Sequence, residues 1–261
     1  MPNKILLVFL FSAWVIFGLN GFAEEIAPKY GPNAVPLSKN SNHNYFVENK
    51  APDFWALIPF YVHQENDSSC SAAALITVLN GARRNQPLTA SDELVTHKSL
   101  TQKYSDDKYK GAVSGDIKVA ASYSVMRLGV SVEKLSQVVK EAAEKLHIWN
   151  EKSEVKLVTI NQKDKVTSKK LFHDILVKNE KSADDFVILN FTQGILTGDP
   201  EGMKGHIAAV GGYDNKRRLV LILDPDRQWY EPYWSPEDKV FEAVADSRSD
   251  AAPGYVYFKV K

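Results

Sequence analysis

The chain has 261 residues, in which 32 Lys and Arg residues are balanced by 32 Asp and Glu residues, so its formal net charge is zero. This balance gives no electrostatic case for nucleic-acid binding. A single cysteine excludes an internal disulfide and a cysteine-rich metal site, so its thiol is either an inert core group or a nucleophile.

The chain begins with a segment typical of a secretory signal, residues 1–23. Lys4 precedes an apolar run from Ile5 to Leu19, and small residues just before Glu24 predict cleavage after Ala23. The rival interpretation is an uncleaved anchor, but about 15 apolar residues fall short of the ~20 that a membrane helix needs. We therefore expect an exported, periplasmic protein without stable membrane insertion. An unused free thiol in that oxidising compartment would be at risk of oxidation.

An arm and a central helix are expected next. Residues 24–53 contain Pro28, Pro32 and Pro36 with little periodicity, and predict an extended arm, of which residues 24–44 precede the main domain, residues 45–261. Helical spacing then begins at Cys70, since Cys70, Ala74 and Val78 recur every four residues. Candidate N-cap residues stand directly before it: Asp67, Ser68 and Ser69. The alanines at 72–74 favour a helix that packs closely on all sides.

The rest of the chain indicates helices first and strands afterwards. Residues 116–128 predict a helix, and residues 133–147 predict an amphipathic one. Runs of β-branched and aromatic residues then predict strands at 155–160, 186–191, 206–213, 219–223 and 255–260. This order predicts an α+β fold in which a helical lobe lies beside an antiparallel sheet. The Lys-rich stretch 163–181 is interpreted as a solvated surface.

Two of these strands bring partners to the thiol. If their hairpin turns at Asn215, His206 and Asp224 are directly opposed on one face of the sheet. Cys70 at the positive end of a helix dipole favours the thiolate, and His206 would take its proton and hand it to a leaving amine. Asp224 would orient the imidazole, and Gln64 with the Cys70 backbone N–H would stabilise an oxyanion.

Each of these residues also has an inert interpretation. A lone buried Cys70 is commonly a small hydrophobic residue, His206 a satisfied strand-end residue and Asp224 an ordinary strand stop. The remaining histidines are scattered and lack the spacing of zinc ligands, so no protein metal site is expected. Pattern alone leaves the nucleophile and the inert thiol both open.

Two motif blocks resemble the phytochelatin synthase family. From Gln64 to Asn80 the chain reads Q-x5-C-x2-A-x-L-x2-V-L-N. From Gly205 to Pro236 it reads G-H…G-G-Y…L-I-L-D-x2-R-x2-Y-x-P-x-W-x-P. The resemblance implies a papain-like fold over residues 45–261, of the short prokaryotic type that lacks the Cys-rich C-terminal domain of plant members.

The resemblance also implies a reaction on glutathione. The family cleaves its Cys–Gly bond, releases glycine and holds γ-glutamylcysteine as a thioester, which water resolves to γ-glutamylcysteine or a second glutathione resolves to phytochelatin. Cys70 would be the nucleophile, His206 the base, Asp224 the orienting acid and Gln64 the oxyanion donor. The implied substrate-binding residues are Asn190, Gly205, Arg227, Tyr230 and Arg248. No cofactor is bound tightly, Cd²⁺ or Zn²⁺ enters only as a complex with substrate thiolates, and homodimer formation is left open.

Two departures from the family pattern leave the substrate open. The family has an arginine where this chain has Gln193, and another where it has Pro253; both could contact substrate carboxylates, and Arg248 would compensate from an adjacent loop. The alternatives are a papain-like peptidase or amidase with another peptide substrate, and a non-catalytic protein that binds thiols or metal–thiol complexes.

Overall fold

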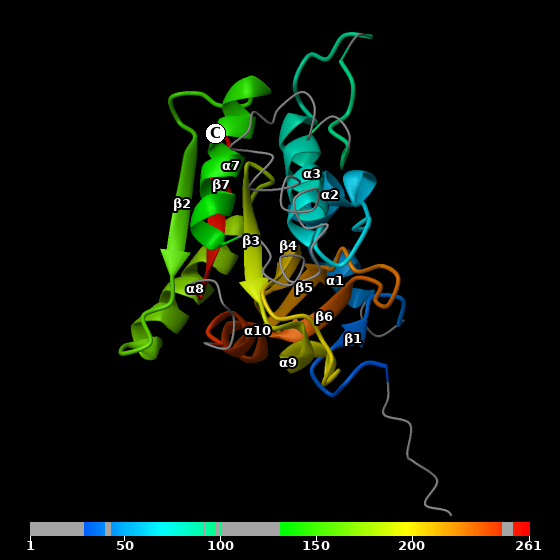
Figure 1. Ribbon diagram of the computed structural model, residues 1–261, viewed down its shortest axis with the longest axis vertical. Coiled ribbons are helices and arrows are strands. Elements are labelled where there is room, and N and C mark those ends of the chain that lie inside the picture. Colours follow the sequence, from blue (N-terminus) through cyan, green and yellow to red (C-terminus); the bar gives the residue numbers. More distant parts are fainter. Residues whose placement is uncertain (1–28, 40–42, 91, 98–99, 101–130, 247–252) are drawn as a thin grey trace, which may run out of the picture.

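One seven-stranded antiparallel sheet organises the protein (Figure 1). The computed structural model describes residues 29–39, 43–90, 92–97, 100, 131–246 and 253–261. Across the sheet the strand order is β1-β6-β5-β4-β3-β7-β2. The strands are β1 (Val35–Pro36), β2 (Glu154–Thr159), β3 (Asp185–Phe191), β4 (His206–Asp214), β5 (Leu219–Leu223), β6 (Tyr233–Pro236) and β7 (Gly254–Lys259). The five predicted strands are confirmed within one residue at either end, and β1 and β6 are additional.

Helices cover both faces of this sheet. The described helices are α1 (Asn44–Glu48), α2 (Pro52–Leu57), the 3-10 turn η2 (Ile58–Phe60), α3 (Cys70–Arg83), α7 (Val132–Lys145), α8 (Lys165–Asn179), α9 (Gln193–Thr197) and α10 (Glu237–Val244). One apolar core joins α2, α3 and α7 to the first face, through residues such as Leu75, Leu135 and Ile188. A second core joins α8 and α10 to the other face, where Phe172 and Phe241 meet Tyr255. Figure 1 shows α8, α9 and α10 gathered at one end of the view, away from α3.

The α+β class and the antiparallel sheet are confirmed, and helices pack on both faces of the sheet. The stretch 163–181 is largely the helix α8, which buries Phe172, Ile175 and Leu176 while its lysines face outward. The many charged residues of α8 made its buried apolar stripe hard to recognise in the sequence. The predicted helix 133–147 is confirmed as α7, and the predicted helix 116–128 lies outside the described residues.

The extended arm predicted for 24–53 is also partly wrong, because α1 and α2 fall inside it. Proline stands at the first position of α2, where its missing N–H costs nothing and its fixed φ suits a helix. The proline that begins α2 is Pro52, which is not one of the three prolines that indicated an extended chain. Residues 35–36 of the arm pair with β6 at the sheet edge.

The hairpin of β4 and β5 forms with a register different from the predicted one. Leu223 lies opposite Ala209 rather than Ile207, and a bulge shifts the register again between Val210 and Gly212. A Cβ on Gly211 would lie 2.7 Å from Leu223 Cγ, so the bulge needs glycine there. The shift at the Leu223 end is two residues, an even number, so side chains keep their face of the sheet.

Among the described residues, no helix has the length and apolar character needed to cross a membrane.

Candidate active site

Cys70 is the first residue of α3, as the sequence predicts. All fourteen residues of α3 are buried, so Cys70 lies at the end of a helix enclosed by the rest of the protein. Ser69 is the N-cap residue, but its side chain does not cap the helix. Its Oγ instead accepts hydrogen bonds from the backbone N–H groups of Glu65 at 2.8 Å and Asn66 at 3.0 Å. Ser69 therefore closes the turn that leads into Cys70.

His206 and Asp224 form a buried pair. His206 Nε2 lies 2.6 Å from Asp224 Oδ1, and the two residues are 1% and 0% exposed. Gly205 has φ +69°, a left-handed conformation that glycine adopts without strain, directly before His206 enters β4. The contact predicted from the hairpin is therefore made, although the register that suggested it is shifted.

The two groups polarise each other. Burial lowers the pKa of His206, but the Asp224 carboxylate outweighs it and raises that pKa well above its ordinary value. Burial raises the pKa of Asp224, but the His206 charge and the hydrogen bonds to the carboxylate bring it below its ordinary value. The favoured state is an imidazolium beside a carboxylate.

The second nitrogen of His206 lies toward the thiol. Since Nε2 is taken by Asp224, Nδ1 is the nitrogen left for Cys70, and among the described residues it has no hydrogen-bond partner. Cys70 is close enough to raise the pKa of His206 further. A thiol, an imidazole and a carboxylate in series can generate a nucleophile and later return a proton to a leaving group.

Two residues that the sequence did not assign to the site hold Asp224 Oδ2. Tyr233 donates its hydroxyl hydrogen bond at 2.9 Å, and the Gln193 amide donates at 3.1 Å. The Asp226 N–H donates to the other carboxylate oxygen at 2.9 Å. Tyr233 falls at an unspecified position of the second motif block, and Gln193 drew notice only as a departure from the family pattern. Neither position carried a signal that it contacts a carboxylate.

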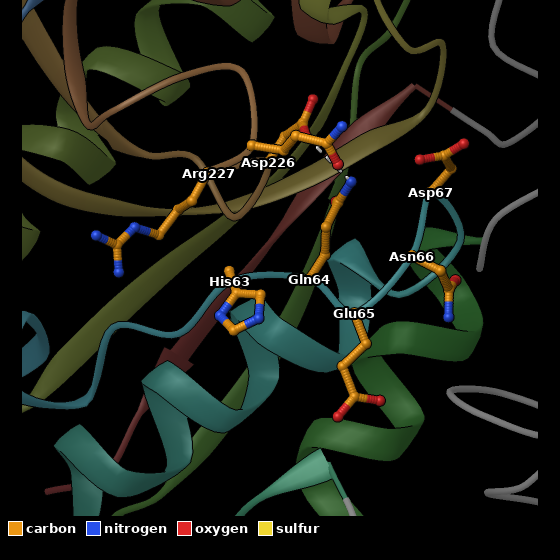
Figure 2. A pocket seen from close by; sticks show the side chains of 8 residues that line it. His63, Gln64, Glu65, Asn66, Asp67, Asp226 and Arg227 are labelled. Atoms are coloured by element: carbon orange, nitrogen blue, oxygen red, sulfur yellow. Dashed lines mark hydrogen bonds between the residues drawn. The ribbon is translucent and has the colours of Figure 1, made fainter.

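Gln64 lines a cavity of about 400 Å³ beside this pair (Figure 2). Its amide Nε2 donates to Asp226 Oδ1 at 3.3 Å, and Figure 2 shows the side chain extending toward Asp226 while that of Arg227 extends away. The Arg227 guanidinium lies 5.0 Å from the centre of the Tyr61 ring. The full lining is His63, Gln64, Glu65, Asn66, Asp67, Asp226, Arg227 and Gln228. The cavity is polar and of mixed charge.

The other predicted substrate-binding residues differ in their surroundings. Asn190 is buried on β3, and its Oδ1 has no partner in the described part of the chain. Tyr230 is buried, and its hydroxyl donates to Asp199 at 3.0 Å rather than lining the cavity. Arg248 lies outside the described residues. Within the described ranges, no cluster of three or more His, Cys, Asp or Glu residues could hold a metal ion.

A family model described as phytochelatin synthase matches residues 29–255, which include Cys70, His206 and Asp224. The chain belongs to the phytochelatin synthase family. The Cys70 and His206 motif blocks, 125 residues or more apart in the sequence, thus fall within one match to the phytochelatin synthase family.

Two plant proteins are similar to part of the chain. Glutathione gamma-glutamylcysteinyltransferase 3 of Lotus japonicus is 33% identical over 73 residues, which are 28% of this chain and 15% of that protein. Glutathione gamma-glutamylcysteinyltransferase 1 of Arabidopsis thaliana is 32% identical over 73 residues, 28% of this chain and 14% of that protein. The matched segment is thus a small part of each relative's length.

Proposed function

We propose that this protein is a cysteine-dependent acyltransferase that cleaves the Cys–Gly bond of glutathione. The observation that carries the proposal is the buried His206–Asp224 pair, with Nδ1 left for a thiol at the start of α3. Membership of the phytochelatin synthase family and the names of the two plant relatives support the choice of substrate.

The proposed reaction has two halves. Cys70 Sγ attacks the carbonyl carbon of the Cys–Gly bond, and the negative charge that develops on the oxygen is stabilised by the Cys70 N–H and the Gln64 amide. A primary amide carries two N–H groups, so Gln64 can donate to Asp226 and to the oxyanion together. The His206 imidazolium gives its Nδ1 proton to the nitrogen of the departing glycine, which leaves a thioester on Cys70.

The second half removes the acyl group. His206, now neutral, takes a proton from water, or from the α-amino group of a second glutathione that has already lost one proton to solvent, as that nucleophile attacks the thioester. Water yields γ-glutamylcysteine and glutathione yields phytochelatin, and Cys70 is regenerated in both cases. Asp224 keeps the imidazole oriented throughout. Cd²⁺ or Zn²⁺ would enter as a complex with the thiolates of the substrate. We place these steps on a papain-like arrangement, with the nucleophile on a helix and the base on the sheet.

The proposal is tested by Cys70→Ala, with Ser71→Ala as the matched control one residue further along the same buried helix. Glycine release from glutathione should disappear in the first variant and persist in the second. Circular dichroism should show the same fold in both. Unchanged glycine release from Cys70→Ala would contradict the proposal.

A second candidate is a papain-like peptidase or amidase with another peptide substrate. It is favoured by Gln193, which is buried and occupied by internal hydrogen bonds at a position where the family has a guanidinium for a substrate carboxylate. Intact-mass measurement of the protein after incubation with glutathione or with candidate peptides distinguishes the two, because only a true substrate leaves an acyl adduct on Cys70.

We also propose export to the periplasm, from the predicted signal peptide at residues 1–23, which lies outside the described residues. N-terminal sequencing of protein recovered from a periplasmic extract should begin at Glu24. A protein recovered with Met1 in place would contradict cleavage.

A further inference from the structure

Gln193 is a buried polar residue that contacts both Asp224, directly after β5, and the loop that leads to His206. It is the first residue of α9 and is 1% exposed. Its backbone N–H donates to the carbonyl oxygen of Met203 at 2.9 Å. Met203 stands three residues before His206, so this bond fastens the loop before β4 to the start of α9.

The side chain of Gln193 makes two further hydrogen bonds, and the first determines which amide atom faces Asp224. Its Oε1 accepts from the backbone N–H of Met203 at 3.2 Å. Its Nε2 donates to Asp224 Oδ2 at 3.1 Å. A backbone N–H can only donate, so the amide oxygen must face Met203 and the amide nitrogen must face Asp224. The orientation of the amide is therefore determined by the protein.

We propose that Gln193 is a positioning residue that holds the Asp224 carboxylate ionised and aligned with His206. Its side chain binds both Asp224 and the loop before His206, so it limits the movement of these two residues relative to each other. This role rests on the proposed function of Asp224 as the orienting acid. It also implies that Gln193 does not replace the family arginine as a contact for a substrate carboxylate, since it is buried with its amide oxygen held by Met203 and its amide nitrogen held by Asp224.

The physical effect is on the charge of the pair. A donor to a carboxylate stabilises the ionised form, and such a hydrogen bond changes a protonation equilibrium by about a factor of ten. Without it, Asp224 takes up a proton at a higher pH. The His206 imidazolium then loses its partner, and the thiolate of Cys70 loses the imidazolium.

The test is the rate at which iodoacetamide alkylates Cys70 as a function of pH. For Gln193→Met, which has a similar length but neither donor nor acceptor, the acid side of the rate profile should move about one pH unit higher, and the rate should stay within about twofold of wild type at pH 8. For Gln193→Arg, which restores a donor, the rate at pH 5 should equal or exceed that of wild type. Gln137→Met, on the exposed side of α7, is the control and should leave the profile unchanged.

A merely structural role would lower the thermal stability of both Gln193 variants and leave the acid side of the profile in place. An unchanged acid side in Gln193→Met, or a shift in the same direction in Gln193→Arg, overturns the proposal. If Gln193→Met does not fold, Gln193→Asn takes its place, because its amide is one methylene too short to reach Asp224. Alkylation needs no glutathione, so a lack of glycine release would count against the proposed function and not against this inference.

Discussion

Replacing Glu180 by glutamine should remove much of the pH dependence of stability. Glu180 directly follows α8 and joins it to both β4 and α1. One carboxylate oxygen accepts from the Tyr45 hydroxyl, and the other accepts from the Tyr213 backbone N–H at 2.6 Å. The absence of a side chain on Gly212 leaves room for it, since a Cβ there would lie 3.6 Å from Glu180 Oε2.

The magnitude follows from the ionisation of this carboxyl group. Burial raises the pKa of Glu180 from 4.5 to about 7, despite the opposing hydrogen bonds from Tyr45 and Tyr213. Between these two values the folded state holds a proton that the unfolded state has lost, so stability falls as pH rises through this window. The full shift corresponds to about 3 kcal/mol of unfolding free energy. Glutamine keeps the shape and an acceptor oxygen, but it cannot ionise.

The assay is urea unfolding at pH 5 and pH 8 for wild type, Glu180→Gln and the exposed control Glu144→Gln. From pH 5 to pH 8, wild type and the control should lose about 2.5 kcal/mol more than Glu180→Gln does, because part of the full shift falls below pH 5. Buried carboxyl groups that do not interact with Glu180, such as Asp185, contribute equally to all three proteins and cancel in the comparison. Equal pH dependence in wild type and Glu180→Gln would refute the reasoning.

Three further outcomes are expected. Tyr233→Phe removes a hydroxyl donor from Asp224 and should lower kcat for glycine release about tenfold without unfolding the protein; an unchanged kcat would show that this bond does not matter. Asn80→Ala removes both hydrogen bonds that its amide makes to the backbone of Val95, and urea unfolding should show a loss of about 2–4 kcal/mol. Because Asp224 raises the pKa of His206, the imidazolium persists above neutral pH, and kcat/KM should decline only well on the alkaline side; a decline centred near pH 6.5 would contradict this.

The candidate site could be predicted largely because it depends on local periodicity in α3 and on the alternation of side chains between the two faces of a strand. The start of α3 at Cys70 follows from four-residue periodicity and the polar turn before it. The contact of His206 with Asp224 survived an error of two residues in register, since only an odd slip moves a side chain to the other face. Near the turn, Tyr213 lies opposite Val220, three residues from the predicted partner, and the one-residue bulge at Gly211 restores an even displacement at the Leu223 end. Without that bulge the prediction would have failed.

What the sequence did not reveal depends on contacts between distant segments. Gln193 and Tyr233 reach Asp224 from α9 and β6, and no spacing rule relates these positions to one another. Helix α8 was obscured by its lysines, which cover its exposed side while Phe172 and Leu176 point into the second core. The burial of an amide against a carboxylate is visible only once the chain is folded.

The buried helix α3 has a consequence for how the protein loses activity. The proposed nucleophile, Cys70, belongs to this helix, whereas His206 belongs to β4 and Asp224 directly follows β5. The proposed reacting atoms are therefore aligned by the packing of the helix against the sheet. No rotation of a single loop can realign them. One methylene added at buried Ala74 would overpack the interface and shift the helix slightly from the sheet. Such a shift should abolish the reactivity of the Cys70 thiol while every helix and strand is still present. Turnover would then report on the core earlier than any measure of secondary structure.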